Sequence, residues 1–231
     1  MKLAPFDQTK WAGSFATIAR QQEAAVSPDR GVCTGLCLIW LRLMQAPEKR
    51  TPTERMRELA GSIPEAVRLQ AQYEATALAE AERRKKDDAM TAGLAAAAGS
   101  LDLGVFEKTV VERSCVGKAG MVRTLERDLA ERDARVLWGL VGPDGGHAIA
   151  GVNNSGRTQT TTDRNTLHVF DPNHGEYVLQ PQELPAMVEE WHRLSPMYAR
   201  FTVMKRRSVS FLDEMTSPGT PSPFFSELPK P

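Results

Sequence analysis

Residues 31–41 read GVCTGLCLIWL, and this stretch decides the fold. A turn that contains glycine is followed by a run, Cys33 to Met44, that is apolar on almost every side. The run is long for a strand, and a helix that is hydrophobic all round is a buried one. The sequence therefore predicts a buried helix that begins at or next to Cys33.

The composition is that of an ordinary globular protein, with 231 residues, 41% of them apolar and 25% charged. The 29 basic and 29 acidic side chains cancel, so no overall field favours nucleic acid or an acidic membrane. No apolar run is long enough to span a bilayer. The first residues, MKLAPFDQTKWAGSF, lack the apolar core and cleavage site of a Sec signal peptide. We expect one domain over residues 1–215, with a mobile tail rich in Pro and Ser at 216–231.

Helical patterns occupy most of the first hundred residues. An amphipathic helix is predicted over residues 8–26. Residues 53–98 are rich in Ala, Glu, Arg, Lys and Leu, and Gly61 and Pro64 are expected to divide this helical insert into two helices. The insert separates the first motif from the second, and we expect it to select the substrate.

Strand patterns dominate the rest of the chain. Helices are also predicted there, at residues 116–132 and 182–194. The predicted strands are residues 105–113, 135–141, 147–153, 166–171, 177–179 and 199–205. Successive strands with turn-rich joints predict an antiparallel meander, and helices followed by sheet predict an α+β fold.

The three cysteines, Cys33, Cys37 and Cys115, are too few and odd in number for a disulfide scaffold, which favours reduced thiols. Cys33 and Cys37 have a spacing that suits two metal ligands on a helix, but no further cysteine or histidine pair completes a zinc set. We expect no metal and no other cofactor.

Cys33 is placed where a cysteine nucleophile would be activated. The positive end of a helix lowers the pKa of a thiol, and the same N–H groups stabilise an oxyanion. The alternative is that Cys33 fills space in the core, the commonest fate of a free cysteine. Residue type alone favours this second interpretation.

Two further motifs supply a base and an acid. His147 opens an apolar strand directly after the Gly145-Gly146 turn, and Asp171 ends a strand before Pro172. A carboxylate on a neighbouring strand can orient the histidine and stabilise its charged form. Each residue alone also fits an ordinary turn. Taken together, the order Cys33, His147, Asp171 is the papain-like layout and predicts a catalytic triad.

The chain resembles the YopT/AvrPphB family of papain-like cysteine proteases, effectors that bacteria inject into host cells. The resemblance rests on G-x-C-x-G-L followed by Trp40-Leu41, on G-H-A-I-A and on F-D-P-N-x-G-E-Y, and spans residues 31–177. It implies a helical lobe carrying Cys33, the nucleophile, packed against an antiparallel sheet carrying His147 and Asp171.

The resemblance also implies a setting and a substrate. The protein would leave the bacterial cytoplasm without a Sec signal peptide and be delivered into a host or target cell. Its partner would be a host protein, such as a small GTPase or a kinase, and neither nucleic acid nor a transmembrane segment is expected. The chain departs from the family in that only 32 residues precede Cys33, fewer than such effectors usually carry. The oligomeric state, the secretion route and any self-processing stay open.

The family's side-chain oxyanion donor lies upstream of the cysteine, which is a second point of departure. Ser27, Pro28 and Asp29 stand there, and none is an amide donor. The backbone N–H of Cys33 is therefore the expected donor, with Gln21 and Gln22 as remote alternatives.

Other residues receive modest interpretations. Trp40 is expected to anchor the helix in the core, and Cys37 and Cys115 are expected to pack there or at its edge. His174 is a competing base candidate, whereas His168 and His192 stand in ordinary strand and helix contexts.

Three alternative functions stay open at this stage. A deamidase or transglutaminase would attack a Gln or Asn side chain with the same triad. A binding module would carry the triad idle, and a metal-dependent enzyme is a more distant alternative.

Overall fold

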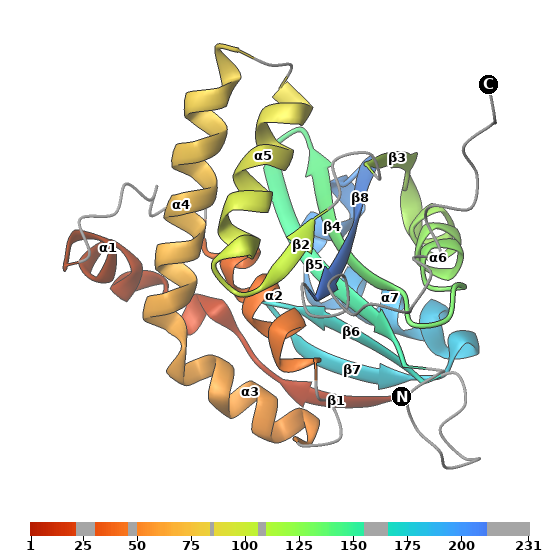
Figure 1. Ribbon diagram of the computed structural model, residues 1–231. Coiled ribbons are helices and arrows are strands. Elements are labelled where there is room, and N and C mark those ends of the chain that lie inside the picture. Colours follow the sequence, from red (N-terminus) through yellow and green to blue (C-terminus); the bar gives the residue numbers. More distant parts are fainter. Residues whose placement is uncertain (22–30, 46–49, 84–85, 106–109, 155–165, 212–231) are drawn as a thin grey trace, which may run out of the picture.

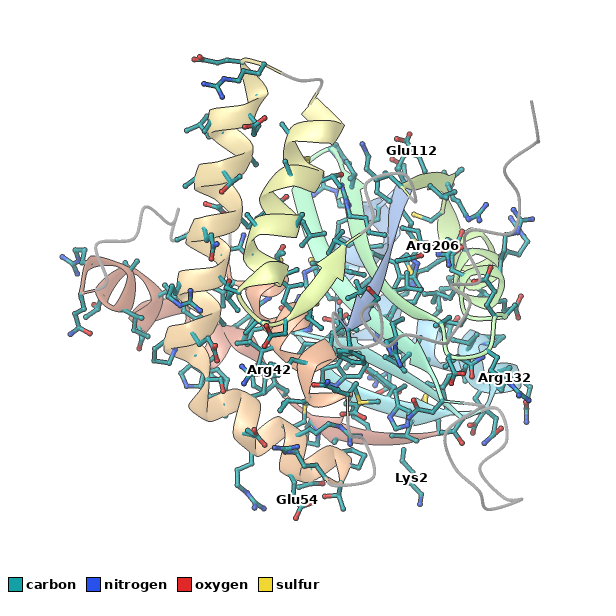
Figure 2. The ribbon with its side chains drawn as sticks, viewed as in Figure 1. Lys2, Arg42, Glu54, Glu112, Arg132 and Arg206 are labelled. Carbon is teal, nitrogen blue, oxygen red and sulfur yellow. The ribbon has the colours of Figure 1, made fainter. Side chains whose placement is uncertain are left out.

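The computed structural model describes residues 1–21, 31–45, 50–83, 86–105, 110–154 and 166–211. Within these residues the predicted α+β, papain-like fold is confirmed: an eight-stranded sheet carries helices on both faces (Figure 1). The predicted tail at 216–231 lies outside the described residues. None of the described helices is long and apolar enough to cross a membrane. Charged side chains such as Lys2, Glu54 and Arg132 point outward (Figure 2).

The sheet has the order β1-β7-β6-β5-β4-β8-β2, with β3 paired to β8. Its strands are β1 (Lys2–Pro5), β2 (Leu103–Val105), β3 (Val111–Ser114), β4 (Arg135–Gly142), β5 (Gly145–Asn153), β6 (Leu167–Asp171), β7 (Gly175–Leu179) and β8 (Val203–Phe211).

The predicted meander is confirmed, because β4, β5, β6 and β7 pair antiparallel in sequence order. Three details of the strand prediction were wrong. β1 was missed, and the single strand expected at 105–113 is two strands. The strand expected at 199–205 starts later, because Pro196 opens a short 3₁₀ helix, η6 (Pro196–Arg200).

The helices are α1 (Ala12–Gln21), α2 (Cys33–Leu43), α3 (Pro52–Gly61), α4 (Ile63–Ala81), α5 (Lys86–Gly99), α6 (Gly117–Asp128) and α7 (Leu184–Leu194), with short 3₁₀ turns η1 (Gln8–Trp11) and η5 (Pro181–Glu183). The helix predicted from residue 8 is η1 followed by α1, and residues 22–26 lie outside the described part. The division near Gly61 is confirmed. A second break after Ala81 was missed, since residues 80–86 are all good helix formers.

Helix α2 starts at Cys33, as predicted, and is the innermost helix. All of its residues except Arg42 are buried, because it packs against α4 on one side and against β5 and β6 on the other. Gly35 permits the contact with α4: a Cβ atom there would collide with the carbonyl oxygen of Ala66. Trp40 is fully buried and stacks on Phe170, with ring centroids 5.5 Å apart, which confirms its packing role.

A buried carboxylate, Glu176 on β7, ties the far half of α2 to the sheet. It accepts hydrogen bonds from Trp40 Nε1 at 3.0 Å and from Arg55 Nε of α3 at 2.9 Å. His168 lies on a strand, β6, as predicted, and its Nδ1 is 2.7 Å from the same carboxylate, a pairing that the sequence did not predict. Burial raises the pKa of Glu176, but the hydrogen bonds from Arg55 and His168 outweigh it and lower the pKa to about 2.

Replacing Gly35 tests the α2–α4 contact. We expect Gly35→Ala to lower the free energy of unfolding by about 1–3 kcal/mol, because the new methyl group must push two helices apart. Urea denaturation measures this. Gly13→Ala is the matched control, since nothing lies near a Cβ at that helical position. That control should leave stability unchanged or raise it by up to about 1 kcal/mol. Equal effects of the two substitutions would contradict the role assigned to Gly35.

Candidate active site

Cys33 and His147 lie side by side where α2 begins and β5 leaves its turn. Cys33 is 8% exposed and His147 is 7% exposed. His147 hydrogen-bonds to the Cys33 sulfur, and the backbone N–H of Ala148 donates to the same sulfur, with a smaller contribution from the Thr34 N–H, which is shared with Gln70. The helix start and the strand therefore both direct donors at one sulfur atom.

Asp171, at the end of β6, lies on the other side of the histidine ring. His147 Nε2 is 3.0 Å from Asp171 Oδ1, which leaves Nδ1 as the nitrogen that faces Cys33. Asp171 is completely buried, and its oxygens find two further donors. Asn173 N donates to Oδ1 at 2.8 Å, and the Tyr198 hydroxyl of η6 donates to Oδ2. The structure thus brings the three predicted residues into one buried chain of hydrogen bonds.

The three groups shift one another's pKa values toward the charged forms. Burial raises the pKa of Cys33, but the hydrogen bond and the charge of His147 outweigh it, so the pKa is lowered. Burial lowers the pKa of His147, yet Asp171 and Cys33 raise it to about 10. The pKa of Asp171 is lowered against its burial, chiefly by His147. All three shifts favour the charged forms: thiolate, imidazolium and carboxylate.

The first N–H groups of α2 are taken by two glutamines from other elements. Gln70 Oε1 of α4 accepts from Thr34 N at 3.2 Å and from Gly35 N at 3.4 Å. Gln8 Oε1 of η1 accepts from Val32 N at 3.3 Å. Among the described residues, none accepts from the N–H of Cys33 itself. The N–H of Cys33, the donor expected from the sequence, therefore lies between N–H groups that the glutamines occupy.

Several residues of the site were missed from the sequence. Gln8, Gln70 and Tyr198 stand outside the motifs, and no local pattern marks them. Asn173 lies within F-D-P-N-x-G-E-Y, where its turn with Asp171 was seen only as a competing explanation. Both interpretations hold, because the turn itself supplies the N–H that the carboxylate accepts.

The residues considered upstream of Cys33 as side-chain oxyanion donors are not seen in the described part of the site. Ser27, Pro28, Asp29 and Gln22 lie outside the described residues. Gln21 is exposed at the end of α1, and no hydrogen bond joins it to the described part of the site.

The remaining candidate residues do not join the site. Cys37 is buried, and burial followed by the charges of Cys33 and Asp171 raises the pKa of its thiol. Burial raises the pKa of Cys115 to about 11. The His174 ring lies against Tyr198, with centroids 5.6 Å apart, and makes no contact with the sulfur that would let it act as the base. His192 Nδ1 lies 2.9 Å from the carbonyl oxygen of Val188.

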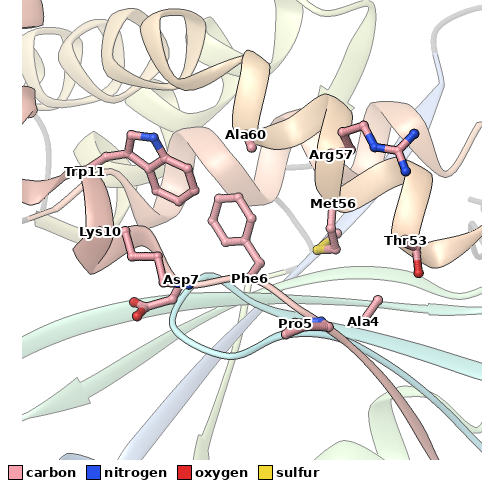
Figure 3. A pocket seen from close by; sticks show the side chains of 10 residues that line it. All are labelled: Ala4, Pro5, Phe6, Asp7, Lys10, Trp11, Thr53, Met56, Arg57 and Ala60. Atoms are coloured by element: carbon pink, nitrogen blue, oxygen red, sulfur yellow. The ribbon is translucent and has the colours of Figure 1, made fainter.

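An apolar pocket of about 250 Å³ opens near the site, between the segment that joins β1 to η1 and helix α3 (Figure 3). Phe6 and Trp11 form one wall, with ring centroids 5.2 Å apart, and Met56 faces them. Lys10 and Arg57 also line it. Phe6 packs edge-on against Phe170, the residue before Asp171, so one wall of the pocket rests on the strand that carries Asp171.

A cysteine at the start of a buried helix, packed on an antiparallel sheet that carries histidine and aspartate, is the architecture of papain-like cysteine peptidases. The sequence profile of the Peptidase_C58 family, described as Yersinia/Haemophilus virulence surface antigen, matches residues 7–205. The chain belongs to this family of cysteine peptidases, which are virulence effectors.

A solved structure supports the same fold. The crystal structure of the Pseudomonas avirulence protein AvrPphB is similar, with a TM-score of 0.59 and 20% sequence identity. The match covers 78% of this chain and 91% of that one. No curated protein sequence matches the chain significantly.

Tyr198→Phe tests the support of Asp171. The substitution leaves one oxygen of a fully buried carboxylate without its donor, which we expect to lower the free energy of unfolding by about 1–3 kcal/mol. Urea denaturation followed by fluorescence measures the loss. Tyr177→Phe is the matched control, because the Tyr177 hydroxyl is buried but makes no hydrogen bond to Asp171. Equal losses for both variants would show that Tyr198 does not support the carboxylate.

Proposed function

We propose that this chain is a protease that cleaves a peptide bond of a host protein with Cys33, His147 and Asp171. The observation that carries the proposal is the buried chain of hydrogen bonds from Asp171 through His147 to the Cys33 sulfur. Membership of a family of virulence effector peptidases supports a host protein as substrate, reached by delivery into the host cell.

The geometry supports a sequence of steps in which each residue has a defined role. The Cys33 thiolate attacks the carbonyl carbon, and the Cys33 N–H donates to the oxyanion that forms. The His147 imidazolium gives its proton to the departing amine, leaving an acyl group on the sulfur. Neutral His147 then takes a proton from water, which attacks the acyl group and releases the acid and the thiolate. Asp171 holds the ring and stabilises its charged form throughout.

The reactivity of Cys33 toward iodoacetamide tests the proposed nucleophile. A lowered thiol pKa means that the thiolate is present above that pKa and is lost only when the pH falls through it. We therefore expect Cys33 to be alkylated at mildly acid pH, with a plateau that lasts until His147 loses its proton near pH 10.

Peptide mass spectrometry across the pH range identifies which cysteine reacts. Cys115, whose pKa is raised to about 11, is the internal control and should stay unmodified below the upper end of the range. Cys33 reacting no faster than Cys115 at mildly acid pH would refute the proposed nucleophile.

The outcome of the reaction is tested on host proteins. Host-cell extract treated with the wild type should yield new protein termini that are absent after treatment with Cys33→Ala, because hydrolysis of a peptide bond creates them. N-terminal proteomics measures this. A substrate that keeps its length but gains the mass of one amide-to-acid conversion would instead identify a deamidase. A tight stoichiometric partner without any product would identify an idle triad.

A further inference from the structure

The start of α2 is capped in an unusual way. The first N–H groups of a helix have no partner within the helix, and Ser, Thr, Asp or Asn at the N-cap usually accepts from them. Here the N-cap residue is Val32, which has no side-chain acceptor. The two glutamines that replace it, Gln8 and Gln70, are 7% and 4% exposed and lie on different elements. Both bring a neutral amide oxygen where a carboxylate would be the stronger acceptor.

The orientation of Gln70 is set by its neighbours. Its Nε2 donates to Glu74 Oε1 at 2.9 Å, so its oxygen must face α2. Ala66, which contacts Gly35, lies one turn before Gln70 on α4, so the close approach of the two helices brings the amide into range. The negative charge therefore lies on Glu74, one helical turn along α4 from Gln70. Only the neutral amide of Gln70 contacts the start of α2.

Gln8 joins the start of α2 to the loop that follows Asp171. Its backbone N donates to Pro172 O at 2.8 Å, and its Nε2 donates to Asn173 Oδ1 at 2.7 Å. The hydrogen bonds of Asn173 and Val32 then complete a ring that returns to Cys33. This single side chain fixes the position of the nucleophile's helix relative to the acid.

We propose that Gln8 and Gln70 are positioning residues that cap α2 on both sides of the Cys33 N–H while keeping negative charge away from the thiol. The inference rests on the proposed function, because it concerns the same nucleophile. The neutral caps leave the positive end of the helix to stabilise the thiolate. They also leave the Cys33 N–H as the donor that an oxyanion can use.

The charged and titratable groups around Cys33 are few among the described residues. His147 faces it from β5, Asp171 lies behind that histidine on β6, and Cys37 is one turn along α2. On α4, Glu74 lies behind Gln70. On α3, Arg55 is paired with Glu176. A carboxylate moved to position 70 would thus be a new charge close to the thiol.

The exchange Gln70→Glu with Glu74→Gln provides a test that conserves net charge. It keeps a hydrogen-bonded amide–carboxylate pair on α4 but moves the negative charge one turn toward Cys33. We expect the pH at which Cys33 alkylation by iodoacetamide is lost to rise, so that the rate at mildly acid pH falls about tenfold. Gln72→Glu is the matched control, because Gln72 lies on the same helix and faces α5 through Ala96. That control should leave the alkylation profile unchanged.

A second variant covers the case in which the exchange does not fold, which circular dichroism would reveal. Gln8→Glu brings a carboxylate to Val32 N–H from the opposite side. It should also raise the pH at which Cys33 alkylation is lost, which is the acid limb of the alkylation profile. A folded exchange variant whose acid limb matches the wild type, or moves no further than that of Gln72→Glu, would overturn the proposal. So would an unshifted acid limb in folded Gln8→Glu.

The two proposals fail in different ways, because alkylation needs no protein substrate. If Cys33 of the wild type titrates like an ordinary thiol, the proposed function fails before any variant is compared. If wild-type Cys33 is activated and the variants leave it so, only the roles of Gln8 and Gln70 fail.

Discussion

In the proposed mechanism, a negative charge on the buried sulfur of Cys33 is the constraint on which the rest of the site depends. An ionised group in the interior is costly unless a charge of opposite sign and hydrogen bonds compensate for it. His147 supplies the positive charge, and it is buried too, so Asp171 must balance it in turn. The chain of compensation ends at Tyr198 and Asn173, whose donors occupy the oxygens of the aspartate. Because each group compensates for the next, loss of any one group leaves a buried charge without the partner that offsets its desolvation.

A thiolate is useful only if the helix that carries it cannot shift. Helix α2 is held near both ends by polar groups from distant parts of the chain. Glu176 holds Trp40, and the glutamines hold the start. Two glycines of the sequence motifs also serve to hold these segments in place. Gly31 adopts φ of +69° where it passes Gln8, and Gly175 adopts φ of +115° where the paired strand β1 lies against it.

How much of this was predictable depends on how local each signal is. The helix at Cys33 and the strands of the meander follow from hydrophobic patterns within a few residues, and they were found. The three residues proposed as a triad could be singled out because each lies in a recognisable turn or helix start, and their catalytic role stays a prediction. Gln8, Arg55 and Tyr198 were missed because their roles depend on partners up to 165 residues away in sequence, and burial of a polar side chain leaves no local pattern. Strand β1 was missed because its four residues carry no alternation that would mark a strand.

The helical block at residues 53–98 shows why prediction from patterns and observation of packing differ. From the sequence it was an insert between two motifs and a place for substrate selection, and that selection stays a prediction. In the structure its inward side helps to build the site, since Arg55 pairs with Glu176 and Gln70 caps the nucleophile's helix. A change on that side would alter the nucleophile as well as any contact with substrate. If this block selects the substrate, selection that is independent of the chemistry would fall on outward positions such as Leu78, which is 76% exposed on α4.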